Sequence, residues 1–155
     1  MADILKMTVP GKPEYVSTVR MAAAAFALSA GFDVEEIEDI KVAISEVCMN
    51  LILHGDEPGV FEQLHPDVTS YEVHFEIDKD ELSIYVEDHG IGYDPETEAY
   101  SASGDVKTVS LGVFIVKALM DEVEIRAKAD LVDPGICVCM KKHRHPDYPE
   151  YEDIL

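Results

Sequence analysis

Two alternating runs with a short polar turn between them constrain the fold of this chain most. Residues 71–77 and residues 82–86 each alternate apolar and polar side chains, and a polar triplet separates them at 78–80. A period of two is the pattern of a strand that buries one face. So short a polar connection predicts that the two strands pair as a β-hairpin.

The other apolar residues predict three helices and three further strands. The helices are expected over residues 14–30, 33–55 and 111–120, and the strands over residues 4–9, 122–127 and 136–140. Gly31 is a stop for the first helix, and Asp33 with Glu36 forms a capping box at the start of the second. We predict an α+β fold, a two-layer α/β sandwich with helices on one face of a mixed, mostly antiparallel sheet.

The length of the chain indicates one domain. With 155 residues, 47% of them apolar, it can bury a single core. We expect this domain over residues 1–142 and an exposed acidic tail over residues 143–155. Residues 93–110 are polar and form a long connection, which is typical of functional or disordered loops.

The chain is strongly acidic. It has 32 acidic and 12 basic side chains and a formal net charge of −20. Nucleic acid and anionic membranes repel such a protein, so neither is an expected partner. A basic protein surface would be attracted, although the same charge also serves simple solubility.

Cysteine usage and the first residues indicate the cytoplasm. Cys48, Cys137 and Cys139 are odd in number and lack the spacing of a disulfide framework or a zinc site, so we expect reduced thiols. There is no signal-peptide pattern and no apolar run long enough to span a bilayer. A reducing compartment is consistent with both observations.

Glu46 and Asn50 are the first candidates for chemistry. They lie four residues apart on the second predicted helix, so they share a face that points away from its apolar stripe. A carboxylate can take a proton from a hydroxyl, and an amide oxygen is a hard ligand suited to Mg²⁺. Taken alone, such a pair is more often part of a solvated helix face.

Asp88 and three glycines are further candidates. Asp88 follows the alternating residues of the second hairpin strand and is expected on their core face, where an adenine amino group could satisfy it. Gly90 and Gly92 would let the backbone approach a flat ligand, and Gly112 is expected where the long loop meets the third helix, a place that favours phosphate. Each motif alone has an ordinary structural explanation, in a turn or a cap.

In this order, the motifs resemble the nucleotide-binding boxes of the GHKL ATPase/kinase superfamily. The runs PEYVSTVR, EIEDIKVAISEVCMN, HGIGYD and ALMDEV further resemble the bacterial anti-sigma-factor serine-protein kinases, over nearly the whole chain to about residue 142. The resemblance implies the Bergerat ATP-binding fold, with ATP and Mg²⁺ as ligands and residues 93–110 as a lid.

The resemblance also implies a role for each motif. Glu46 would be the general base, Asn50 would bind Mg²⁺, and Asp88 would bind the adenine amino group. The other nucleotide-binding positions that it implies are Gly90, Gly92, Lys107, Ser110, Leu111, Gly112, Val113 and Cys137.

The partners implied by the resemblance are proteins. Such a kinase sequesters a sigma factor, phosphorylates an anti-anti-sigma protein of the STAS fold on serine, and forms homodimers. Arg20 falls where the family has a partner-contacting arginine, although a plain surface arginine is equally consistent with its position.

Two positions depart from the family pattern. Ser110 stands where a glycine is usual, and Cys137 stands where the last strand commonly has a threonine. The loop before the third helix carries Lys107 among four acidic residues, so little positive charge faces a phosphate there. The alternatives are therefore a non-catalytic, nucleotide-responsive anti-sigma binding module, and an acidic decoy for a basic nucleic-acid-binding protein.

Overall fold

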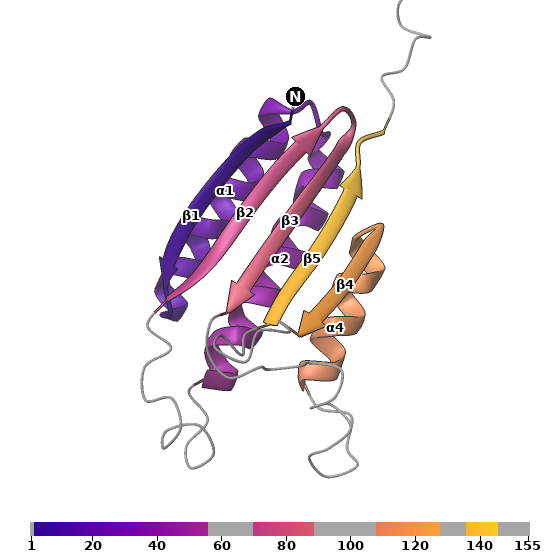
Figure 1. Cartoon of the computed structure of the whole chain (residues 1–155). Helices are drawn as coiled ribbons and strands as arrows, with labels where there is room; N and C mark the ends of the chain where they lie inside the picture. The colour runs from indigo at the N-terminus through magenta and orange to yellow at the C-terminus, as the bar shows by residue number, and fades with distance from the viewer. Residues whose placement is uncertain (1, 56–69, 89–107, 128–135, 146–155) are drawn as a thin grey trace, which may run out of the picture.

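The computed structural model describes residues 2–55, 70–88, 108–127 and 136–145. Its elements, in chain order, are β1 (Asp3–Pro10), the 3₁₀ turn η1 (Pro13–Tyr15), α1 (Val16–Ser29), α2 (Val34–Gly55), β2 (Ser70–Asp78), β3 (Glu81–Asp88), α4 (Thr108–Leu119), β4 (Glu122–Ala127) and β5 (Ile136–His143). The strands form one layer, and the three α-helices cover one of its faces (Figure 1). The two-layer α/β sandwich is confirmed.

The sheet has five strands in the order β1-β2-β3-β5-β4. All four pairings between neighbours are antiparallel, so the described strands include none of the parallel pairing that a mixed sheet would contain. At the centre, Asp78 pairs with Glu81, which leaves Lys79 and Asp80 as a two-residue loop. Lys79 has a φ of 58°, as a tight hairpin turn of this length requires. The predicted hairpin is confirmed.

The core lies between the sheet and the helices. On the central strands, Phe75, Ile84 and Val86 are fully buried, as their alternation predicts, and α2 packs Ile40 and Ile44 against them. Burying each large apolar side chain contributes about 1.5–3 kcal/mol. The opposite face of the sheet carries the intervening polar residues, so α1, α2 and α4 form the only covering layer among the described residues.

Two predicted signals at helix ends are present, the stop after α1 and the capping box at the start of α2. The Asp33 N–H donates to Glu36 Oε1 and the Glu36 N–H donates to Asp33 Oδ1, both at 2.8 Å, which is the capping box of α2. Gly31, with a φ of +88°, follows α1 in the left-handed conformation of a helix stop. No described helix has the length and apolar character needed to cross a membrane.

The last described residues differ from the expected exposed tail. β5 continues to His143, and the Arg144 N–H then donates to the Asp80 carbonyl while its guanidinium contacts the Asp80 carboxylate at 2.7 Å. His145 lies against the start of α2. Residues 143–145 therefore belong to the folded domain, because acidic groups distant in sequence hold them there. Residues 146–155 lie outside the described residues.

Candidate functional site

Glu46, Asn50 and Gly112 meet where α2 packs against α4. The side chains of Glu46 and Asn50 are half-buried and Gly112 is buried. A Cβ added to Gly112 would lie 2.8 Å from Asn50 Nδ2 and 3.1 Å from Glu46 Oε2. The four-residue spacing places the carboxylate and the amide on one face, and α4 approaches that face at a residue without a side chain.

The structure changes the interpretation of Gly112. We expected it at the junction between loop and helix, where its N–H would be free to bind phosphate. The structure begins α4 at Thr108, so Gly112 lies inside the helix. Because Gly112 has no side chain, the ends of Asn50 and Glu46 can lie close to the α4 backbone, and a larger residue would displace them.

An apolar pocket lies beside Asn50, between α2, α4 and strands β4 and β5. The described residues that line it are Val47, Asn50, Leu51, Val113, Val116, Val123, Ile125 and Val138. Among these described residues, Asn50 is the one with a polar side chain. An apolar pocket with a polar group at its margin is a common setting for a flat organic ligand.

Asp88 is the last residue of β3, and its backbone pairs with Tyr71 on β2 and with Ile136 on β5. Its side chain lies outside the described part of the structure. In Figure 1 the end of β3, the C-terminal half of α2, the first turns of α4 and the start of β5 all lie at the same end of the molecule. The fold therefore brings the Asp88 position to the end that holds Glu46 and Asn50.

The remaining predicted residues fall into three groups. Gly90, Gly92 and Lys107 lie outside the described residues. Ser110 and Leu111 belong to the first turn of α4, and Val113 lines the apolar pocket. Arg20 lies half-buried on α1, which Figure 1 places at the other side of the helical layer from α4.

Cys137 does not join the site. It pairs with Glu87 across β3 and β5, and its Sγ lies 3.9 Å from Glu87 Oε1 on the face of the sheet that the helices leave uncovered. The next residue, Val138, points to the helices and lines the pocket. The alternation of side chains along β5 already indicates this position. Val138 and Met140 point to the core, so Cys137 must lie on the opposite face of the sheet.

The pocket-lining residues other than Asn50 and Val113 were missed as site residues. Val47, Leu51 and Val138 match the apolar periods of α2 and β5, so the sequence identifies them as core. No pattern distinguishes an apolar residue that lines a pocket from one that fills the core, since both follow the same period.

Cys48 lies on α2 between Glu46 and Asn50 but has no part in the chemistry. It is fully buried, and burial raises the pKa of its thiol to about 12. Its sulfur therefore stays protonated at neutral pH and is a poor nucleophile. The three cysteines are all free thiols, as expected.

Comparison with known proteins places the chain in a family with this fold. The model of the histidine kinase-like ATPase domain matches residues 9–142, so the chain belongs to that family. A crystal structure of the RsbU and RsbW domains of a Mycobacterium tuberculosis protein superposes with a TM-score of 0.65 at 22% identity. That match covers 93% of this chain and 33% of the longer one, and it supports the fold.

Curated relatives narrow the family further. The serine-protein kinase RsbW of Listeria innocua serovar 6a is 34% identical over 154 residues, covering 92% of this chain and 88% of the relative. RsbW of Bacillus pumilus is 32% identical, covering 99% of this chain and 93% of the relative. Within the histidine kinase-like ATPases, this chain groups with the RsbW serine-protein kinases.

Proposed function

We propose that the chain is an ATP-dependent serine-protein kinase that sequesters a sigma factor and phosphorylates a STAS-type anti-anti-sigma protein. The observation that carries the proposal is the contact of Glu46 and Asn50 with Gly112, because it joins a proton acceptor to a metal ligand. RsbW relatives of nearly the same length are named serine-protein kinases, which supports the same reaction.

The site residues fit ATP and Mg²⁺. The amide nitrogen of Asn50 is the atom nearest to the Gly112 position, and its amide oxygen is the hard ligand that would hold Mg²⁺. The pocket beside Asn50 offers the apolar lining that the rings of adenine would need, and Asp88 at the end of β3 is the proposed residue for the amino group. Bound Mg²⁺ would supply neutralisation of charge on the phosphates.

Glu46 is the proposed general base. Its carboxylate lies beside Asn50 and is half-buried, so a serine hydroxyl presented at this end of the molecule can reach it from solvent. It would accept the hydroxyl proton as the oxygen forms its bond to phosphorus. Catalysis in such a site consists chiefly of positioning and electrostatics, which one carboxylate and one metal ligand on a rigid helix can provide.

The proposed partners are proteins. A net charge of −20 favours a basic surface on the sigma factor, and Arg20 on α1 is the proposed contact to an acidic group of a partner. Free thiols fit the reducing cytoplasm as the proposed compartment.

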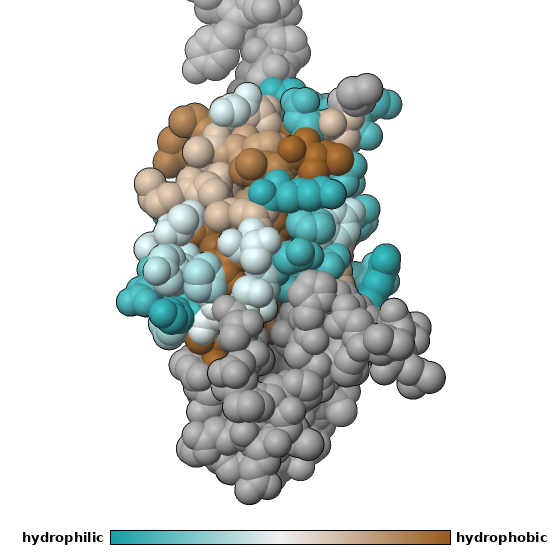
Figure 2. All heavy atoms as spheres, turned by 60° about the vertical axis from the view of Figure 1, so that its left-hand side comes forward, coloured by the Kyte–Doolittle hydropathy of each residue, from teal (hydrophilic) through white to brown (hydrophobic). Residues whose placement is uncertain are grey.

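A homodimer is part of the proposal. The flank formed by β1 and α1 exposes four large apolar side chains: Ile4, Leu5, Met21 and Leu28. Figure 2 brings this flank forward and shows apolar surface gathered in its upper half. Since β1 is the edge strand among the described residues, a second copy could cover both its outer backbone edge and this apolar surface.

Calorimetry of ATP binding with Mg²⁺ tests the nucleotide site first. Wild type should bind ATP, and Asp88→Asn should bind much more weakly because a neutral amide oxygen accepts a weaker hydrogen bond from the adenine amino group than a charged carboxylate does. Glu72→Gln on the uncovered face of the sheet is a control that should leave binding unchanged. Absence of ATP binding by the wild type would contradict the proposed kinase.

A further inference from the structure

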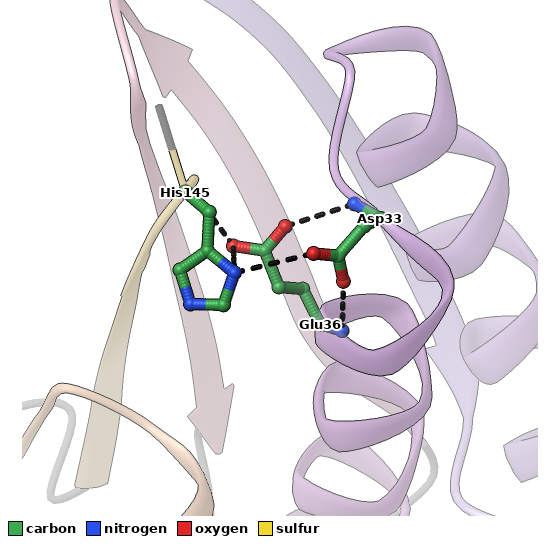
Figure 3. Close-up of side chains that lie close together, drawn as sticks. All are labelled: Asp33, Glu36 and His145. Carbon is green, nitrogen blue, oxygen red and sulfur yellow. Dashed lines mark hydrogen bonds and ion pairs between the residues drawn. The ribbon is translucent and has the colours of Figure 1, made fainter. Parts of the chain in front are cut away.

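A histidine near the end of the described chain is held by two carboxylates at the start of α2. The His145 N–H donates to Glu36 Oε2 at 2.7 Å. Its ring nitrogen Nδ1 lies 3.2 Å from Asp33 Oδ2 and 3.5 Å from Glu36 Oε2. Figure 3 shows the ring on the side of the chain after β5, facing both carboxylates, which come from the start of α2.

Glu36 is the unusual member of this cluster. Its side chain is 2% exposed, whereas those of Asp33 and His145 are 51% and 62% exposed. A buried carboxylate is costly unless donors or a cation satisfy it. The N–H groups of Asp33 and His145 supply two donors, and the imidazole is a cation 3.5 Å from Glu36 once that ring is protonated.

The other charged groups near His145 are already paired. Lys142 on β5 donates to Asp39 on α2, at 3.2 Å, and Arg144 contacts Asp80 in the β2–β3 turn at 2.7 Å. Of the two, Lys142 opposes protonation of His145, while Asp33 and Glu36 favour it and prevail.

We propose that Asp33, Glu36 and His145 form a pH-sensitive clasp that fastens the end of β5 to the first turn of α2, closed while His145 is charged and loosened when it is neutral. The start of α2 and the chain after β5 thereby act as a single unit, although they lie 109 to 112 positions apart in the sequence. The clasp is separate from the proposed kinase site, although Glu46 and Asn50 lie further along the same helix.

The direction of the pH effect follows from the two pKa shifts. The pKa of His145 is raised, chiefly by its hydrogen bond to Asp33 and then by the charge of Glu36, with Lys142 opposing. A raised pKa means that the clasp is at full strength below the ordinary histidine pKa and weakens as pH rises through the higher, folded value. The pKa of Asp33 is lowered, chiefly by the backbone N–H of Glu36, so its contribution is lost only in acid.

Amide hydrogen exchange of the full chain, followed by NMR at pH 6 and pH 8.5, tests the clasp. After correction for the intrinsic exchange rate, protection of the His145 N–H should fall at the higher pH, by up to about tenfold for each unit by which the pKa is raised. In His145→Gln, protection should be lower at pH 6 and equal at the two pH values. Equal corrected protection in the wild type would overturn the proposal.

Two variants separate the clasp from general effects on the fold. His74→Gln changes a histidine on β2 that pairs with Glu72, and it should keep the wild-type pH dependence at His145. Asp33→Asn keeps a capping side chain at the start of α2 but removes its charge, so the NMR-measured pKa of the His145 ring should fall. An unchanged ring pKa in Asp33→Asn, or a lost pH dependence in His74→Gln, would contradict the clasp.

Discussion

Gly112 of α4 lies so close to Asn50 of α2 that a single added carbon would stand 2.8 Å from the amide nitrogen. The same carbon would lie 3.1 Å from the carboxylate of Glu46. Both atoms are at the ends of flexible side chains, so a methyl group at this position would displace the proposed catalytic groups more than the helices. A substitution at Gly112 should therefore affect activity more than it affects stability.

Gly112→Ala should therefore lose activity while keeping its fold. Alanine in place of glycine inside a helix gains about 0.8–1 kcal/mol of propensity, which offsets the steric cost. Displacing catalytic groups by around 1 Å can slow a reaction by about 10²-fold. Phosphoryl transfer and thermal melting should be measured on the same preparation.

Ala118→Gly is the matched control for that variant. Ala118 is exposed on the same helix, so its replacement should lower stability by about 1 kcal/mol and leave transfer unchanged. The two substitutions thus have opposite signatures. Wild-type transfer rates in Gly112→Ala would show that the contact with Glu46 and Asn50 has no part in activity.

Glu46→Gln should slow phosphoryl transfer by about 10²- to 10⁴-fold, the usual contribution of a general base. The substitution keeps the size of the side chain and its contact with α4, so ATP binding should remain close to that of the wild type. Single-turnover transfer to the serine substrate, with ATP affinity measured separately, distinguishes the two effects. Glu38→Gln, an exposed acid of α2 paired with Lys41, is the control and should behave as wild type. Equal transfer rates for Glu46→Gln and Glu38→Gln would refute the base.

Much of the fold follows from periodic apolar residues. The β2–β3 hairpin, the capping box at Asp33 and the shared face of Glu46 and Asn50 all depend on neighbours within a few positions, and all three match the structure. The first turn of α4 was missed because Thr108 to Ser110 carry no apolar period, although nothing in them breaks a helix.

The parts that the sequence did not predict depend on distant partners. His145 pairs with Asp33 and Glu36, more than a hundred positions away, and no local pattern records such a pair. The pocket beside Asn50 is lined by valines that resemble any core residue. The expected position of Gly112 at the start of a helix was wrong, and its approach to Asn50 is likewise set by how two helices pack.

Lys142→Met should destabilise the domain by about 1–3 kcal/mol, since it leaves polar groups without their donor. The Lys142 side chain is 11% exposed, and its amine donates to the last carbonyl of α4, at Leu119, and to Asp39 on α2. Methionine preserves the apolar stem but serves neither acceptor. The melting temperature should decrease by about 2–4 °C for each kcal/mol lost.

Lys41→Met is the control for this variant. It removes a surface pair with Glu38 and should stay within about 0.5 kcal/mol of wild type. Equal effects of the two variants would contradict a structural role for Lys142.

Tyr71→Phe should stabilise the domain or leave it unchanged, unlike most changes in a core. Tyr71 is 1% exposed, and among the described residues its hydroxyl has no well-formed hydrogen bond, with only the weakly bonding Cys48 thiol beside it. Burial, together with the neighbouring Cys48, raises the pKa of this hydroxyl, so it stays neutral. Removing this buried hydroxyl should raise the free energy of unfolding by about 1 kcal/mol, because the cost of desolvating it no longer opposes folding. Tyr85→Phe on the uncovered face of the sheet is the control, expected within about 0.5 kcal/mol of wild type. A loss of stability in Tyr71→Phe would contradict this account and would show that the hydroxyl is satisfied in the fold, by the Cys48 thiol or by a group outside the described residues.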